Sequence, residues 1–264
     1  MSAQGTQAEL PIPVDDKTDA FSKVARVTFA FWVIKICATT LGETGGDAVS
    51  MTLHLGYAVG TLIFLAFFCV TLVAQVASKR YHPFFYWALV VATTTVGTTT
   101  SDYLDRTLGL GYVETSIFLF SAVIVVLLAW RYSTGTIAVD HVTTRKNEIF
   151  YWVAILVSNT LGTALGDFVA TTTGLGFEGG ALVFASLIAL VAAAYFFTRA
   201  SRGLLFWAAY VLTRPLGATL GDTFTKSHAL GGLALSRISS SLAIAAAMVV
   251  IVALTSQRER VPVA

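Results

Sequence analysis

Apolar residues along this chain come in eight runs of about 20 residues, a length that is enough to cross the hydrocarbon core of a bilayer. The runs lie roughly at 28–48, 57–77, 83–103, 112–131, 149–169, 178–198, 204–223 and 235–255. Short polar segments separate them. The pattern therefore predicts an all-α polytopic membrane protein with eight transmembrane helices.

A fourfold repeat underlies these runs. In each unit an aromatic-Trp pair is followed by a glycine ten residues after the Trp, then by an aspartate five residues after that glycine, and a Leu-Gly pair ends the unit. The anchors are Trp32, Gly42 and Asp47; Trp87, Gly97 and Asp102; Trp152, Gly162 and Asp167; Trp207, Gly217 and Asp222. Each unit holds two helices, so all four units enter the membrane from the same side as parallel repeats.

The chain divides into two pseudo-symmetric halves of two repeats each. The predicted parts are a cytoplasmic N-terminal tail 1–26, a first half 27–132, a cytoplasmic linker 133–148, a second half 149–257 and a C-terminal tail 258–264. Twelve Lys and Arg residues fall on the side of both termini, and only Arg106, Lys226 and Arg237 on the other. Because basic loops stay in the cytoplasm, we expect both termini there, with the repeat tryptophans near the cytoplasmic interface.

Composition supports the membrane interpretation. The chain is 56% hydrophobic and 12% charged, against about 25% charged in a typical soluble domain. A net charge of +2 is too small to indicate a nucleic-acid partner. Neither Cys37 nor Cys69 has metal-binding spacing. We therefore expect the lipid bilayer as a partner, no nucleic acid and no cofactor, and we leave a homo-oligomer open.

Small residues recur four positions apart on the first helix of each unit, a spacing that lets helix backbones approach closely in lipid. The pairs are Gly42 and Gly46, Gly97 and Ser101, Gly162 and Gly166, and Gly217 and Gly221. We interpret them as packing residues. The four helices that carry them should form the inner bundle.

Polar residues occupy a second face of the same helices, at i, i+3 and i+7. They are Thr40, Glu43 and Asp47; Thr95, Thr98 and Asp102; and Thr160, Thr163 and Asp167; the fourth unit keeps Asp222. Two cations, Lys35 and Arg214, also lie within spans, and we expect each to pair with an acid of a neighbouring helix. Five carboxylates against these two cations leave an excess of negative charge, which favours a cation site or proton coupling.

Carboxylates and hydroxyls without thiolates suit hard or borderline cations such as Mn²⁺, Mg²⁺, Ca²⁺ or Na⁺. The leading hypothesis is a carrier for such a cation, with Glu43, Asp47, Asp102, Asp167 and Asp222 as metal ligands or proton carriers. Alternatives are a pore, a carrier of a small organic amine or amino acid, and a structural or sensory protein. An intramembrane aspartyl protease would need a Gly-x-Gly-Asp motif that this chain lacks, so we do not expect an enzyme.

The polar runs also carry a resemblance. The segment KICATTLGETGGD at 35–47, with TTTVGTTTSDYL at 93–104 and NTLGTALGDFV at 159–169, resembles a bacterial repeat family of uncharacterised membrane-anchored proteins. The resemblance covers nearly the whole chain. It implies a polytopic inner-membrane protein built from a repeat of unknown function.

Overall fold

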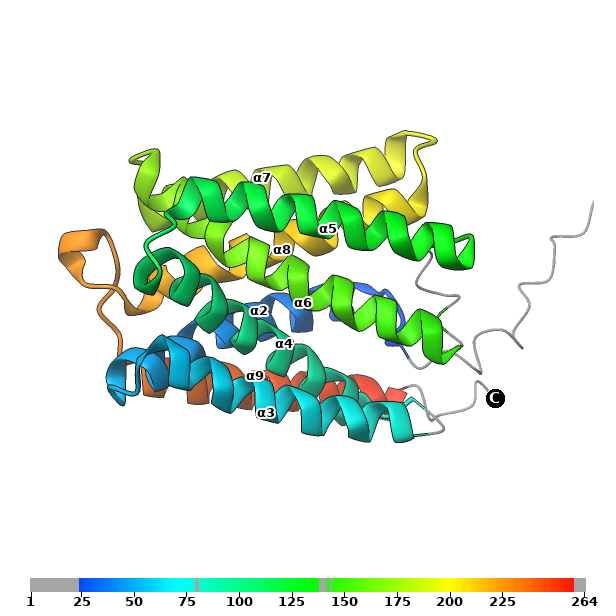
Figure 1. The fold of residues 1–264 in the computed structure, drawn as a ribbon, viewed down its shortest axis with the longest axis horizontal. Helices are drawn as coiled ribbons and strands as arrows, with labels where there is room; N and C mark the ends of the chain where they lie inside the picture. Colours follow the sequence, from blue (N-terminus) through cyan, green and yellow to red (C-terminus); the bar gives the residue numbers. More distant parts are fainter. Residues whose placement is uncertain (1–23, 79–80, 138–141, 143, 259–264) are drawn as a thin grey trace, which may run out of the picture.

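The computed structural model describes residues 24–78, 81–137, 142 and 144–258. In this part of the chain there are eight long helices and no strand, so the predicted all-α architecture is confirmed (Figure 1). The predicted N-terminal tail up to residue 23 lies outside the described residues. So do most of the linker's centre and residues 259–264 of the predicted C-terminal tail.

Each repeat contributes one inner and one outer helix. The inner helices are α2 (Phe29–Asp47), α4 (Pro83–Asp102), α6 (Arg145–Asp167) and α8 (Arg202–Thr225). The outer helices are α3 (Gly56–Ala77), α5 (Tyr112–Thr134), α7 (Gly176–Phe197) and α9 (Arg237–Arg258). Five-residue π-helical turns continue the first three inner helices, at Ala48–Thr52, Tyr103–Thr107 and Phe168–Thr172. A short 3₁₀ helix, His228–Leu230, follows α8 instead.

The repeated Leu-Gly pair marks the reversal between inner and outer helices. Its glycine has a positive φ in every repeat, from 68° to 84°, a conformation that costs glycine little and other residues much more. These glycines are Gly56, Gly111, Gly176 and Gly231. A turn requirement therefore explains this part of the repeat.

The inner helices form a closed ring, in which α2 packs on α4, α4 on α6, α6 on α8 and α8 back on α2. Each outer helix packs chiefly on the inner helix of the following repeat: α3 on α4, α5 on α6, α7 on α8 and α9 on α2. In Figure 1 the pairs α5/α7 and α3/α9 flank the inner helices on opposite sides. The contact of α9 with α2 joins the last repeat to the first.

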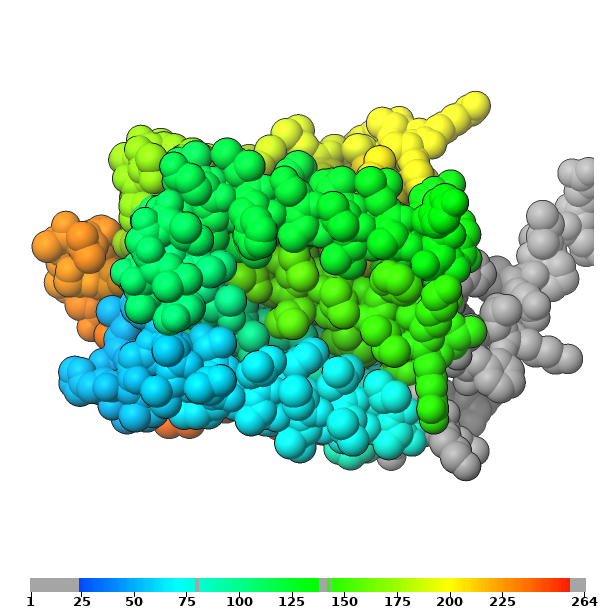
Figure 2. Space-filling view, viewed as in Figure 1, coloured from blue at the N-terminus to red at the C-terminus, as the bar shows by residue number. Residues whose placement is uncertain are grey.

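The outer helices present apolar side chains outward. Leu62, Ile117, Leu182 and Leu242 are each 63–70% exposed, one on every outer helix. Figure 2 shows α3 and α5 lying lengthwise on one face, with part of α6 visible between them. Five helices are long and apolar enough to cross a membrane, namely α3, α5, α6 with its π-turn, α7 and α9. The other three carry the hydroxyls, glycines and charges that face the ring, which lowers their hydropathy.

Aromatic side chains fill one end of the ring. Trp87, Trp152 and Trp207 are at most 4% exposed, and each makes an edge-to-face contact with the aromatic residue that precedes it. The hydroxyls of Tyr86 and Tyr151 are 2.7 Å apart across the α4–α6 contact. Trp87, Trp152 and Trp207 also contact Phe31, Tyr86 and Tyr151 of the neighbouring inner helices, so they pack inside the ring. Their predicted place near the cytoplasmic interface stays a prediction.

The repeat glycines are the points of closest helix approach. A Cβ atom added to Gly42, Gly162 or Gly217 would overlap Thr94, Arg214 or Thr39 of the adjoining inner helix. At Gly97 it would lie 2.9 Å from the backbone carbon of Asn159. Each contacted residue stands three positions before the repeat glycine of its own helix. Glycines four residues later, Gly46, Gly166 and Gly221, face Thr98, Ala218 and Glu43 in the same way.

Replacing Gly97 by Ala tests this packing. Because the new methyl meets backbone rather than a movable side chain, we expect a loss of about 1–3 kcal/mol of stability, the usual cost of overpacking. The matched control is Gly45→Ala on α2, whose Cβ would find only Ser241 Oγ, 4.0 Å away. That variant should be neutral or about 0.5–1 kcal/mol more stable. Thermal unfolding of the purified protein in detergent compares the two, and equal midpoints would contradict the packing argument.

Candidate functional site: the charged axis of the ring

The polar side chains of the inner helices meet on the axis of the ring in successive layers. Residues at the same offset from the repeat glycine lie at the same layer, because the four inner helices contact one another at equivalent positions. One position after the glycine come Glu43, Thr98, Thr163 and Ala218, and five positions after it come the four aspartates. All eight of these residues are at most 2% exposed.

Arg214 joins all four inner helices in the first of these layers. Its fully buried guanidinium donates from Nη2 to Glu43 Oε2 at 3.1 Å, to Thr98 Oγ1 at 2.5 Å and to Thr163 Oγ1 at 2.6 Å. Thr98 Oγ1 also donates to Glu43 Oε2 at 3.2 Å. The expected pairing of Arg214 with an acid of a neighbouring helix is present, and it runs from α8 to α2.

Lys35 has different neighbours from those expected. Its ammonium donates to Asn159 Oδ1 at 3.2 Å and lies 4.0 Å from the centre of the Tyr210 ring. Asn159 in turn donates from Nδ2 to Thr93 Oγ1 at 2.9 Å. The predicted ion pair between Lys35 and an acid is therefore wrong. An amide oxygen and an aromatic face hold the ammonium instead, because the acids lie two to three turns farther along α2 and its neighbours.

Two cations that follow inner helices hold the aspartate layer together. Arg106 pairs with Asp102 (Nε to Oδ1, 3.0 Å) and with Asp167 of the next repeat (Nη2 to Oδ2, 3.1 Å). Lys226 pairs with Asp222 (Nζ to Oδ1, 3.1 Å) and with Asp47 of the first repeat (Nζ to Oδ2, 2.9 Å). Each cation thus bridges its own aspartate and the aspartate of the following inner helix.

Lys226 is itself 7% exposed, directly after the last residue of α8. Burial alone lowers the pKa of an ammonium, but the carboxylates of Asp222 and Asp47 outweigh it and raise the pKa of Lys226 well above its usual value. The side chain therefore stays charged between the two acids. Arg237, at the start of α9, adds a longer contact of 3.5 Å from Nε to Asp47 Oδ2.

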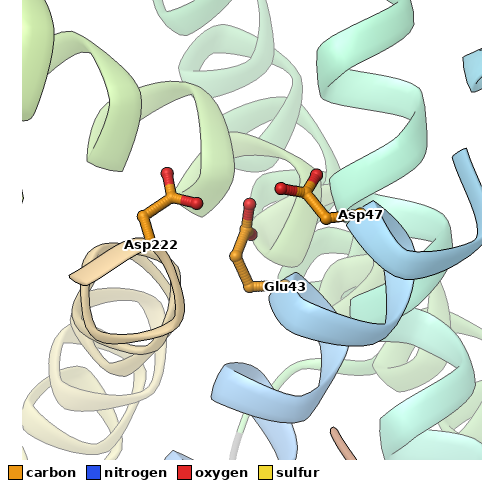
Figure 3. Close-up of side chains that lie close together, drawn as sticks. All are labelled: Glu43, Asp47 and Asp222. Carbon is orange, nitrogen blue, oxygen red and sulfur yellow. The ribbon is translucent and has the colours of Figure 1, made fainter. Parts of the chain in front are cut away.

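Three carboxylates converge beside Lys226. Glu43 and Asp47 on α2 and Asp222 on α8 each offer an oxygen within 4.8 Å of the others, and all three are buried. Figure 3 shows the three side chains directed toward one shared space between the helices. Among the described residues, Asp47 Oδ1 accepts no hydrogen bond. Oxygen ligands of this kind suit hard cations.

The family model for the Repeat of Unknown Function (DUF347) matches this chain four times, at residues 30–81, 85–136, 150–201 and 205–260. The chain belongs to the DUF347 repeat family. The predicted membership in a fourfold repeat family of unknown function is thus confirmed. No curated protein and no solved structure matches the chain.

The DUF347 repeats alternate in charge around the ring. Arg106 and Lys226 occupy the same place in the second and fourth repeats, nine residues after the repeat glycine, where the first and third carry Met51 and Thr171. The aspartate layer therefore has twofold rather than fourfold symmetry. The sequence contains the signal for these partners, because both basic residues stand four positions after an aspartate, which is one helical turn.

The excess of negative charge on the axis of the ring is much smaller in the structure than the sequence predicted. Arg106 and Lys226 were assigned to the outer loops, but the π-turn and the end of α8 turn their side chains inward onto the aspartates. With them, four cations face five carboxylates on the axis of the DUF347 ring. Arg237 supplies a further positive charge beside Asp47.

The predicted hydroxyl face divides into two groups. Thr98 and Thr163 contact Arg214, as a polar axial site requires. Thr40, Thr95 and Thr160 instead donate to carbonyls of their own helices, at 2.9 Å to Ile36, 3.1 Å to Val91 and 2.9 Å to Leu156. The backbone takes up the hydrogens of these three hydroxyls, and no contact joins them to Arg214 or the acids among the described residues, so their part in the site stays a prediction.

A double-mutant cycle tests the Arg214–Glu43 pair. Arg214→Met leaves a buried carboxylate without its cation, so we expect a loss of about 3–5 kcal/mol. Adding Glu43→Gln to it should recover part of that loss. Thermal unfolding in detergent measures both, with Arg131→Met on the exposed side of α5 as a control expected to stay within about 0.5 kcal/mol. Strictly additive effects would show that the two side chains do not stabilise each other.

Proposed function

We propose that this protein is a membrane carrier for a small divalent cation, and that Glu43, Asp47 and Asp222 bind it. All eight long helices span the bilayer in this proposal, with both termini in the cytoplasm of a bacterial cell. The outward apolar side chains of α3, α5, α7 and α9 support the membrane location. The polar inner helices are then shielded from lipid by the outer ones.

The observation that carries the proposal is the group of three buried carboxylates beside Lys226. Their oxygens come from two different helices and lie within 4.8 Å of one another, a spacing that one ion can bridge. Lys226 pairs with two of the three acids, Asp47 at 2.9 Å and Asp222 at 3.1 Å. An entering cation would replace this tethered ammonium, which would move out toward the adjoining loop.

Charge favours a divalent ion at this place. When Lys226 moves away, three carboxylates remain opposite the buried guanidinium of Arg214, an excess of two negative charges, or of one if the partly exposed Arg237, 3.5 Å from Asp47, is counted. A buried site is most stable when its charges are matched. Manganese, magnesium and calcium all accept carboxylate oxygens, and manganese is the borderline member of the group.

Transport would require the ring to open alternately at its two ends. The aromatic layer of Trp87, Trp152 and Trp207 closes one end, and the Arg106 and Lys226 bridges close the other. The Arg106 and Lys226 bridges each join the half 27–132 to the half 149–257. Breaking them would therefore allow one half to move against the other. Rocking of repeat units about a central site is a common way to provide alternating access.

A structural or sensory role is the second candidate, because the near balance of axial charge is what a network that only fixes helix packing would have. A carrier of a small organic amine or amino acid and a pore would use the same residues. Uptake by the purified protein separates these functions.

Reconstituted protein in liposomes should take up Mn²⁺ and lose most of that uptake on Asp222→Asn. Losing one charged ligand should weaken binding by about 1.4 kcal/mol or somewhat more or less, and 1.4 kcal/mol corresponds to a tenfold lower affinity. Asp102→Asn is the matched control, because Asp102 occupies the same place in the second repeat but pairs with Arg106. Lys226→Met should strengthen equilibrium Mn²⁺ binding, since no internal cation then competes.

Equal losses for Asp222→Asn and Asp102→Asn would contradict the assignment to the three-carboxylate group. Uptake of none of Mn²⁺, Mg²⁺, Ca²⁺ and Na⁺ by the folded wild-type protein would contradict cation transport. Saturation kinetics distinguish a carrier from a pore, whose flux continues to rise with concentration.

A further inference from the structure

Three buried hydrogen-bond donors without acceptors belong to two neighbouring side chains of α8. Among the described residues, Arg214 Nε and Nη1 and the Tyr210 hydroxyl have no hydrogen-bond partner, although both side chains are fully buried. Tyr210 and Arg214 are four residues apart on α8, so they share one helix face. Lys35 of α2 lies over the Tyr210 ring and uses one of its three N–H groups, toward Asn159.

Lys35, Tyr210 and Arg214 adjoin one another, because Lys35 lies 4.0 Å from the Tyr210 ring centre and Tyr210 is one helical turn from Arg214. Of the guanidinium nitrogens of Arg214, Nη2 is bonded to Glu43 and the two threonines. A guanidinium carries five N–H donors in a fixed plane, so the Nη2 contacts leave its Nε and Nη1 hydrogens unmatched. A buried donor without an acceptor has lost its hydrogen bond to water without a replacement, which destabilises the protein, and more so when the group is charged.

The local charge, like the unpartnered donors, favours an anionic ligand. Lys35 and Arg214 are two basic side chains at this level, and among the described residues Glu43 is the single acid in contact with either of them. Basic groups therefore outnumber acids here by one. The aspartate level, a turn away, holds four acids against Arg106 and Lys226, with Arg237 at its edge. Positive and negative excesses thus lie in adjacent layers.

We propose that Lys35, Tyr210 and Arg214 form a binding site for a small monovalent anionic group. Arg214 Nε and Nη1, the Lys35 ammonium and the Tyr210 hydroxyl would donate to it, and its charge would neutralise the excess. The anion is either inorganic, entering together with the cation, or the carboxylate of a small organic zwitterion whose amine faces the aspartates. The site does not depend on cation transport, because these donors lack an acceptor in either case.

Thermal stabilisation in detergent tests the proposal at constant ionic strength. Sodium gluconate, whose anion is large, is replaced stepwise by sodium chloride or sodium formate, and glycine is added in a separate series. A ligand that binds the folded state raises its apparent stability with a saturable concentration dependence. We expect saturation with at least one of the three probes. Chloride or formate would identify an inorganic or minimal anion, and glycine alone would identify the carboxylate of an organic solute.

Two variants locate the effect. Lys35→Gln keeps a donor toward Asn159 but removes the charge, and it should raise the half-saturating concentration about tenfold or more, as expected for a lost charged hydrogen bond. Tyr210→Phe removes only a hydroxyl and should raise it several-fold. Lys146→Gln and Tyr195→Phe, which alter exposed residues of α6 and α7, should leave it unchanged.

The anion site is overturned if none of the three probes gives a saturable shift. It is also overturned if the shift persists unchanged in both Lys35→Gln and Tyr210→Phe. Stabilisation by Mn²⁺ is measured in the same experiment. An anion response without any cation response would overturn the proposed carrier function and leave the anion site standing, so the two proposals fail separately.

Discussion

Each inner helix meets the next at a glycine whose missing side chain leaves room for an atom of its neighbour. This contact recurs four times around the ring, at Gly42, Gly97, Gly162 and Gly217, always against the residue three positions before the glycine of the adjoining inner helix. The repetition sets a common axial register for all four helices. Because of that register, residues one and five positions after each glycine reach the axis together. The charged network therefore depends on these four close contacts.

The polar and charged groups of this network are buried away from water, so they need hydrogen-bond and ion-pair partners within the protein. Arg214 provides them in the first layer, where it donates to Glu43, Thr98 and Thr163 on the other three inner helices. Arg106 and Lys226 do it for the aspartates, each spanning two repeats. Buried charges are tolerated when they are paired and hydrogen-bonded, and the outer helices pack against the outside of the inner ring. The unmatched donors of Arg214 and Tyr210 and the free Oδ1 of Asp47 are departures from this rule among the described residues, and they mark where a ligand is expected.

The fourth repeat departs most from the others. It carries Arg214 where the first two repeats have Thr39 and Thr94, and Ala218 where the first has Glu43. Its inner helix ends without the π-turn found in the first three repeats, and the outer helix α9 starts six residues after the glycine of the Leu-Gly pair. Both Lys226 and Arg237, at the two ends of that connection, approach Asp47 of the first repeat. The place where the ring closes is thus also the place where its three carboxylates converge.

The sequence by itself determined the local features of this protein. Apolar runs long enough to form spanning helices, four copies of one unit, small residues spaced for close packing and one acid per copy are all properties of neighbouring residues. They predicted eight helices, the repeat family and the identity of the inner helices. The positive φ of Gly56 and its equivalents is local in the same sense, because a tight reversal requires glycine.

The tertiary structure decided which side chains meet. Lys35 was expected beside an acid but reaches Asn159, which is 124 residues away in the chain. Arg106 and Lys226 were assigned to loops, yet each binds the aspartate of another repeat. Thr40 lies on the polar face by spacing but donates to its own helix. Such pairings depend on which helix follows which around the ring and on the axial level of each residue. Both are fixed only when the glycine contacts bring the four helices together, and no segment of the sequence contains that information alone.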